Sequence, residues 1–117
     1  MRRRDLIKNR QSLLILRNEM ADMIIRQMPP FKRVYKKLRA REKLIVNDAI
    51  HAIIKNPKTG QEKKGDLAGV FVHKFKIHHQ EMLLAYEWSS SRRLLLALGT
   101  HENFYRKLKK QNKTNTR

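Results

Sequence analysis

The sequence has no cysteine, so it can form neither a disulfide bond nor a thiolate metal site. It also lacks any apolar run near the roughly 20 residues that a membrane-spanning helix needs, and we expect no membrane segment. There is no phosphate-binding glycine loop, no nucleophile elbow and no pair of carboxylates at catalytic spacing. These absences exclude several common enzyme classes. The lack of cysteine is compatible with the reducing cytoplasm, which is the expected location of the protein.

Acidic residues are scarce, since 10 Asp and Glu stand against 28 Lys and Arg, and the formal net charge is +18 on 117 residues. A surface this basic attracts phosphate backbones, anionic membranes or an acidic protein, and composition does not choose among them. The length suggests one domain, and 40% hydrophobic residues suffice for a small core.

The N-terminal residues 1–19 form a basic extension. Its leucines at positions 6, 13 and 16 have the spacing of a loose amphipathic helix. The apolar stretch "LLIL" is too short for a signal peptide, and Arg17 and Glu19 follow without a cleavage site, so we expect no targeting segment. The extension is interpreted either as an added helix or as the product of an upstream start.

Hydrophobic spacing predicts one strand and two helices in the first half of the chain. Residues 23–28 form a short strand that two prolines end. Residues 30–40 and 41–57 place apolar side chains on one helical face and cations on the other, and Asn56-Pro57 stops the second helix. The two helices are expected to form an αα-hairpin.

The second half changes to a strand pattern. Residues 70–78 alternate in hydrophobicity, whereas 82–88 and 94–99 carry apolar residues on both faces, as buried strands do. A short basic helix over 101–113 closes the chain. We therefore predict an α+β fold, in which the helix hairpin packs on one face of an antiparallel sheet made by these three strands.

Within 70–78, the alternation separates two sets of side chains. Phe71, Phe75 and Ile77 are expected to face the helices, and Lys74 and Lys76 the other, open face near the middle of the sheet. Two lysines aimed the same way suit phosphate recognition, because each ammonium is a compact charge with three donors. The alternative is an ordinary solvated strand face.

A histidine follows the last strand. His101 is expected at or near the start of the closing helix, where its imidazole could transfer protons near neutral pH. It could equally be a helix-start residue partnered with Glu102. Tyr105 lies four residues later, on the same side of a helix, and either Phe104 or Tyr105 is expected to anchor that helix to the core. The other four histidines lack the spacing of a metal site, so neither a metal nor a cofactor is expected.

The stretches "KKGDLAGVFVHKFK", "LLAYEW" and "LLLALGTHENFYRKLK" resemble the RelE/ParE superfamily of type II toxin-antitoxin toxins. The order of strand, two helices and strand meander matches as well. Lys74 and Lys76 resemble the strand lysines of RelE-like toxins, and "GTHENFY" resembles the C-terminal motif of YafQ-like members. The resemblance implies a RelE-like toxin domain over residues 20–112, with 113–117 as a disordered tail.

By this resemblance the chain is a metal-independent endoribonuclease that cleaves mRNA, ribosome-dependently, and so inhibits translation. Its catalytic residues would be His101, Lys74, Lys76 and Tyr105. Five further residues are assigned to RNA binding: Lys63, Lys64, His78, Arg92 and Arg106. The implied partners are mRNA, the ribosome with its ribosomal RNA, and a cognate acidic antitoxin protein.

The sequence departs from the RelE pattern at one strand position, where Leu83 aligns with an arginine of RelE. Lys63, Lys64 or Arg92 are candidates for supplying that charge. Two alternatives stay open on the sequence: a ParE-like inhibitor of DNA gyrase, and a non-catalytic basic RNA-binding protein of the same fold.

Overall fold

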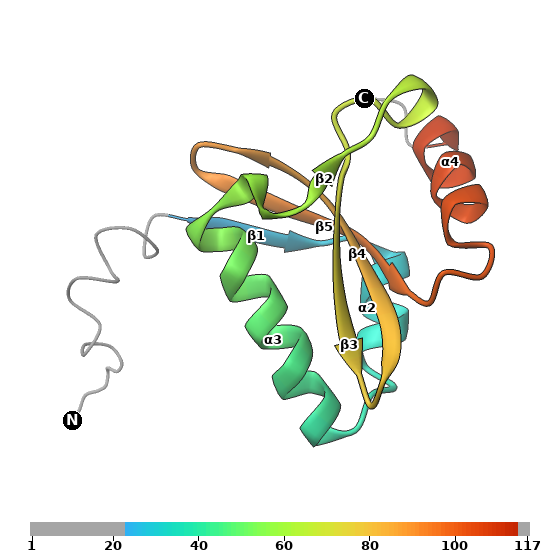
Figure 1. Ribbon diagram of the computed structural model, residues 1–117. Coiled ribbons are helices and arrows are strands. Elements are labelled where there is room, and N and C mark those ends of the chain that lie inside the picture. Colours follow the sequence, from blue (N-terminus) through green and yellow to red (C-terminus); the bar gives the residue numbers. More distant parts are fainter. Residues whose placement is uncertain (1–22, 115–117) are drawn as a thin grey trace.

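A computed structural model of the chain describes residues 23–114. In chain order its elements are β1 (Ile24–Gln27), α2 (Pro29–Tyr35), α3 (Ala40–Lys55), β2 (Gln61–Glu62), β3 (Phe71–Ile77), β4 (Gln80–Ser89), β5 (Arg92–Gly99) and α4 (Phe104–Thr114) (Figure 1). Two single 3₁₀ turns, Pro57–Thr59 and Gly65–Leu67, flank β2. The N-terminal extension and residues 115–117 lie outside the described residues.

The strands form one sheet in the order β1-β5-β4-β3-β2. β3, β4 and β5 are antiparallel neighbours, as the predicted meander requires, while β1 pairs in parallel with β5. The α+β fold predicted from the sequence is confirmed. The two-residue strand β2, which pairs with Phe71 and Val72, was not expected, because "QE" carries no strand pattern.

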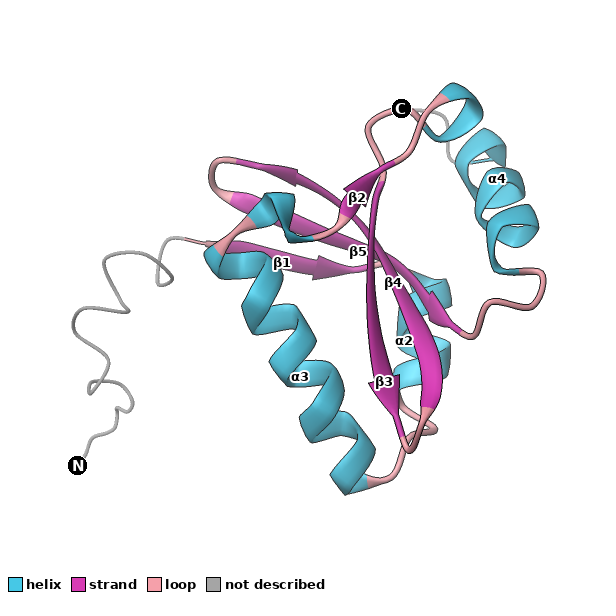
Figure 2. Ribbon diagram, viewed as in Figure 1, coloured by secondary structure: helices cyan, strands magenta, loops and turns pink. Residues whose placement is uncertain are grey.

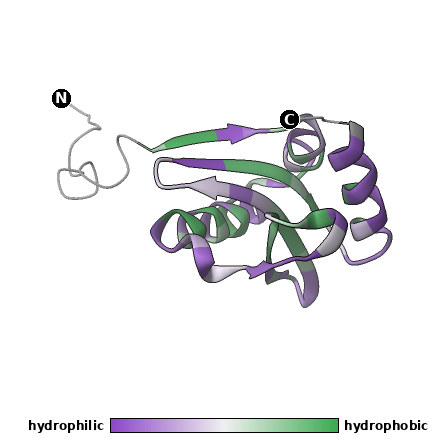
Figure 3. Ribbon diagram, turned by 90° about the horizontal axis from the view of Figure 1, so that it is seen from above, coloured by the Kyte–Doolittle hydropathy of each residue, from purple (hydrophilic) through white to green (hydrophobic). Residues whose placement is uncertain are grey.

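The sheet carries a hydrophobic core on each face. On one face the helix hairpin packs through Phe31, Val46 and Ile53 against β3, β4 and β5. On the other face α4 packs through Phe104 and Leu108. Figure 2 shows the helices on either side of the strands, and Figure 3 shows hydrophobic residues along the central strands with hydrophilic residues on the outside of α4. The second face is therefore partly covered, where the sequence predicted an open one.

Several element boundaries differ from the predictions. α2 ends at Tyr35, five residues early, because backbone turns at Lys37 and Leu38 lead directly into α3. Arg92 and Arg93, which lie between the predicted strands 82–88 and 94–99, begin β5. α4 begins at Phe104 and continues to Thr114, beyond the predicted end of the domain.

Two buried polar side chains of the sheet hold the far end of α3. The Arg93 guanidinium donates hydrogen bonds to the carbonyl oxygens of Ile53 (2.8 Å) and Ile54 (3.0 Å). The Tyr86 hydroxyl donates to the carbonyl of Pro57 (2.6 Å) and accepts from the amide of Gly60 (2.9 Å). Burial raises the pKa of Tyr86, so the phenol keeps its proton at neutral pH. A Cβ at Gly60 would lie 2.8 Å from the Tyr86 hydroxyl, which leaves room only for glycine.

The Tyr86→Phe variant is expected to lose about 1–3 kcal/mol of unfolding free energy, because it leaves the partly buried Pro57 carbonyl and Gly60 amide without their hydrogen-bond partner. Urea denaturation measures the loss. Tyr35→Phe is the matched control, since the Tyr35 hydroxyl has the single partner Asn47 and is only partly buried. Its expected cost is under about 1 kcal/mol. Equal losses in the two variants would contradict the role given to Tyr86.

His73 predicts a pH dependence of stability. Burial lowers its pKa below the usual 6.5, and its ring stacks on Phe75 at 5.8 Å. The unfolded chain then binds a proton at higher pH than the folded chain does. This contribution to stability is complete above about pH 6.5 and is lost as the pH falls through the folded pKa. Between pH 7.5 and 5.5, we expect the melting temperature of the wild type to fall more than that of His73→Phe. Parallel curves would show that His73 is not responsible.

Candidate functional site

His101 lies in the loop between β5 and α4, just beyond the last strand and near the start of the closing helix, as predicted, although the helix begins at Phe104 and not at residue 101. Gly99 is the last residue of β5, and α4 begins only at Phe104. Between them, Asn103 adopts a left-handed backbone conformation (φ 58°), which asparagine tolerates better than most residues. This turn redirects the chain before the helix starts, so the His101 side chain is exposed on the loop.

Tyr105 nevertheless lies beside His101, as the sequence predicted. The loop before α4, and not a helical turn, brings the two side chains together. The two ring centroids are 5.5 Å apart in an edge arrangement. The Lys63 ammonium lies 5.1 Å from the centre of the Tyr105 ring, a cation–π distance. We call His101, Tyr105 and Lys63 the His101 cluster. It joins the loop before α4 and the start of α4 to the segment that follows β2, which is about 40 residues earlier in the sequence.

Phe104, not Tyr105, anchors α4 to the sheet. Its side chain is 6% exposed and packs with Leu108 against the β-sheet face, whereas Tyr105 is only partly buried. Phe104 also meets the Tyr105 ring edge-on at 5.5 Å. The neighbouring aromatic residues therefore divide the two tasks that the sequence left open: one holds the helix, and the other faces His101 and Lys63.

Lys74 and Lys76 are exposed on the sheet face opposite the helix hairpin, as predicted, but that face also carries α4, and the lysines are not near the middle of the sheet. β2 pairs only with Phe71 and Val72, so β3 is an edge strand where the lysines lie. Lys74 is opposite Leu83, which is opposite Gly99, the last residue before the His101 loop. Lys74 is thus two strands, or about 10 Å, from the start of that loop. Lys76 is farther out and lies opposite Glu81, a cross-strand neighbour of opposite charge.

The remaining predicted RNA-binding residues divide into two groups. Lys64 is exposed next to Lys63, and Arg106 is exposed on the first turn of α4, where it donates a hydrogen bond to Asn103 (2.9 Å). Arg92 lies at the opposite end of β5, about 23 Å from Gly99 along the strand. His78 lies in the β3–β4 turn, with Nε2 3.6 Å from a Glu42 carboxylate oxygen. The structure does not bring these last two residues to the His101 cluster.

Residues 23–114 contain no group of three or more His, Asp or Glu side chains that could hold a metal ion. None of the helices in that range has the length and hydrophobicity that a membrane span requires.

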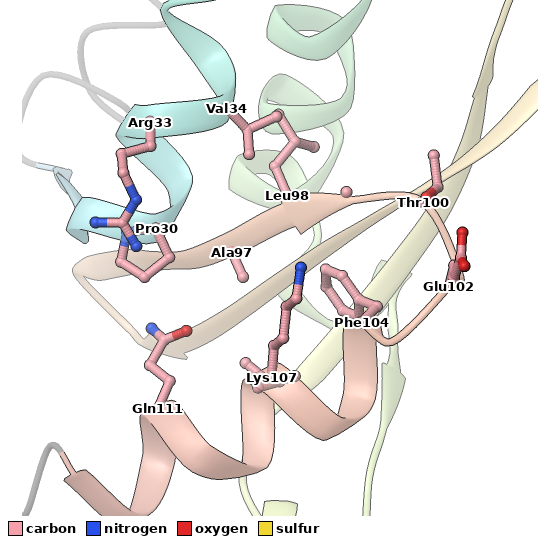
Figure 4. Close-up of a pocket in the computed structure, with 12 residues that line it drawn as sticks. Pro30, Arg33, Val34, Ala97, Leu98, Thr100, Glu102, Phe104, Lys107 and Gln111 are labelled. Carbon is pink, nitrogen blue, oxygen red and sulfur yellow. The ribbon is translucent and has the colours of Figure 1, made fainter.

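A groove of about 360 Å³ lies beside the same loop, between α2, the end of β5 and α4. Its floor is apolar, with Val34, Leu98 and Phe104. Figure 4 shows Arg33 of α2 and Lys107 of α4 reaching toward it from different sides. None of the His101 cluster residues lines it. Local sequence patterns do not predict this groove, because α2 and α4 come to line it together only in the folded chain.

Comparison with known proteins gives one family. A model of the ParE-like toxins of type II bacterial toxin-antitoxin systems matches residues 25–109. No curated protein matches the sequence significantly.

Solved structures of bacterial toxins share the fold. The toxin-antitoxin complex RelBE2 from Mycobacterium tuberculosis matches 68% of this chain and 98% of its own chain, at 19% identity and a TM-score of 0.55. The YoeB/ParE toxin from Agrobacterium tumefaciens matches 68% of this chain and 99% of its own chain, at 20% identity and a TM-score of 0.54. A mutant of the E. coli toxin RelE in the free state matches 81% of this chain and 98% of its own chain, at 10% identity and a TM-score of 0.61. At these identities the likeness concerns the fold.

The different roles of the two aromatic residues of α4 can be tested by measuring the free energy of unfolding of two variants. Phe104→Ala is expected to cost about 3–5 kcal/mol of unfolding free energy, because it empties a buried site under the helix. Tyr105→Ala, its matched control one position away, is expected to cost clearly less, because that ring is only partly buried. Urea denaturation followed by circular dichroism compares them. A larger loss in Tyr105→Ala would reverse the assignment.

Proposed function

This chain belongs to the ParE-like toxins of type II bacterial toxin-antitoxin systems, and we propose that it is an endoribonuclease that cleaves mRNA in the ribosomal A site. The observation that carries the proposal is the His101 cluster. The Tyr105 ring lies 5.5 Å from the exposed His101 imidazole and 5.1 Å from the Lys63 ammonium, and Lys74 is two strands away from the start of the His101 loop. Cleavage of an RNA phosphodiester is accelerated by a group that transfers protons and by cations that stabilise the charge on the phosphate.

The proposed reaction is attack of a ribose 2′-oxygen on the adjacent phosphorus. The 2′-hydroxyl gives up its proton, a bond forms between O2′ and phosphorus, and the bond to the leaving O5′ breaks as that oxygen gains a proton. The products are a 2′,3′-cyclic phosphate and a 5′-hydroxyl end. His101 acts as the general base or as the general acid in this scheme.

The lysines stabilise the extra negative charge that develops on the phosphate oxygens in the transition state. Lys74 is the nearer of the two β3 lysines to the His101 loop, and Lys76 faces Glu81. Lys63 compensates for the missing arginine at Leu83, because its ammonium is held over the Tyr105 ring. Arg92, at the other end of β5, is a poor candidate for that role. Tyr105 stacks on an RNA base or positions the phosphate.

An acidic antitoxin is the proposed protein partner, since a free basic nuclease would harm its own cell. The M. tuberculosis relative is a toxin-antitoxin complex. The charge of +18 complements an acidic protein and also favours docking on ribosomal RNA, which should weaken steeply with salt.

The alternative is inhibition of DNA gyrase, which the ParE-like name of the matching family favours. Such a toxin needs no proton-transfer residue. The two activities differ in what fails first after induced expression: translation for a ribonuclease, and chromosome integrity, seen as a DNA-damage response, for a gyrase inhibitor.

His101→Ala is expected to abolish growth arrest on induction and to lower the mRNA cleavage rate about 10²–10⁴-fold, the usual contribution of a general acid or base. Translation is measured by amino-acid incorporation, and cleavage by detecting 2′,3′-cyclic phosphate ends. Circular dichroism checks that the variant is folded.

The matched control is His51→Ala, which removes an exposed imidazole from α3 and should arrest growth like the wild type. Equal toxicity of folded His101→Ala would remove His101 from the mechanism. A DNA-damage response that precedes translation arrest would favour gyrase inhibition.

A further inference from the structure

The corner between α2 and α3 carries a cluster of cations that the His101 cluster does not use. Six exposed cations lie within ten consecutive residues, and we call them the corner patch: Lys32, Arg33, Lys36, Lys37, Arg39 and Arg41. Glu42 is the one acidic residue between positions 28 and 47. Its carboxylate accepts a hydrogen bond from the Arg39 backbone amide (2.8 Å) and lies 3.6 Å from His78 Nε2. These contacts of Glu42 do not involve the cationic side chains of the patch.

Part of this patch has a local explanation. Lys32 and Arg33 lie in the last turn of α2, where a cation interacts favourably with the negative end of the helix dipole. Lys32 and Lys36, however, are four residues apart, which places like charges side by side.

Arg39 and Arg41 have no such explanation. They occupy the N-cap and the second position of α3, where the helix dipole repels a cation. An N-cap side chain normally accepts a hydrogen bond from the first turn, and an arginine side chain has no acceptor. Both side chains are exposed, so packing does not require them. Residues that oppose local stability without a packing role point to a ligand.

We propose that the corner patch docks the chain on the phosphate backbone of double-stranded RNA. The cations supply backbone contacts. The one aromatic ring at the corner is engaged, because Tyr35 stacks on Phe31 at 5.6 Å and lies under the Lys43 ammonium at 5.5 Å. Single-stranded RNA is usually held by stacking on exposed aromatic rings, whereas a duplex is held by phosphate contacts.

The corner patch lies where it could contact RNA in addition to the His101 cluster. Figure 1 shows the corner beside the tip of the β3–β4 hairpin, and the His78–Glu42 pair links the two. Arg33 also lines the groove whose other wall carries Lys107 and Thr100, next to the His101 loop. A structured RNA held at the corner would therefore lie near RNA held at His101. That the duplex is RNA rather than DNA rests on the proposed function.

The test is binding of a labelled RNA duplex of about 16 base pairs to the full chain, by fluorescence anisotropy over a range of salt concentrations. The variant Arg39→Asp with Arg41→Glu is expected to bind about tenfold more weakly near physiological salt, with a salt slope lower by about two. The same variant should melt at a higher temperature, because it places an acceptor at the N-cap and a carboxylate in the first turn. Weaker binding by a more stable protein cannot come from unfolding.

The charge-matched control is Lys55→Glu with Lys58→Glu, at the other end of α3, about 24 Å away and beyond the screening length. It should change the affinity by less than about threefold. Equal weakening by both variants would assign binding to net charge alone. Unchanged binding by the corner variant would also overturn the proposal and leave an acidic protein as the occupant. A DNA duplex of the same sequence that binds as well as RNA would overturn the assignment to RNA.

Duplex binding does not depend on cleavage, so the proposal and the proposed function can fail separately. His101→Ala should bind the duplex like the wild type even though it cleaves no mRNA. Loss of duplex binding in folded His101→Ala would place the duplex at the His101 cluster instead of the corner patch.

Discussion

The hydrogen bonds of the Arg93 guanidinium are the interaction on which the rest of the structure depends. This buried cation donates to the last carbonyls of α3, where the helix leaves acceptors unsatisfied and presents the negative end of its dipole. Burial lowers the pKa of Arg93, yet a guanidinium remains charged at any pH at which the fold exists. The contact fixes the end of α3 over β5, and Tyr86 fixes the following turn over β4. The path of the chain from α3 to β2 is then determined, and with it the position of Lys63.

The candidate site depends on that path from one side and on α4 from the other. Lys63 arrives from the β2 segment, which is held to β3 by two register pairs and the backbone bond from Lys63 to Val70 (2.8 Å). Tyr105 arrives from α4, which Phe104 and Leu108 hold to the opposite face. The His101 loop lies at the end of β5, where the His101 ring meets the Tyr105 ring. Each group of the cluster is therefore supported by a different part of the core, and all its members remain accessible to a large ligand.

The positions of the cations distinguish those that stabilise the fold from those that have no structural role and are available for binding. Where cations help the fold, at the end of α2 and beneath α3, their positions follow from helix dipoles and unsatisfied carbonyls. Where they oppose it, at Arg39 and Arg41, or remain exposed on an edge strand, at Lys74, no structural reason is found within residues 23–114. Among residues 23–114, exposed cations gather at the corner patch and others lie near the His101 cluster, and both surfaces lie on the proposed path of RNA.

Local patterns in the sequence determined the elements, because hydrophobic periodicity reflects which face of a helix or strand is buried. They gave the helix hairpin, the meander and the faces of Phe71, Phe75, Lys74 and Lys76 correctly. They failed at β2, at the start of α4 and at the sheet position of the lysines, because strand order and edges are set by pairing between distant segments. His101 and Tyr105 could be singled out from one short stretch. Only the tertiary structure decided that Lys63 joins them while Arg92 and His78 do not, since contacts between distant residues leave no local periodicity.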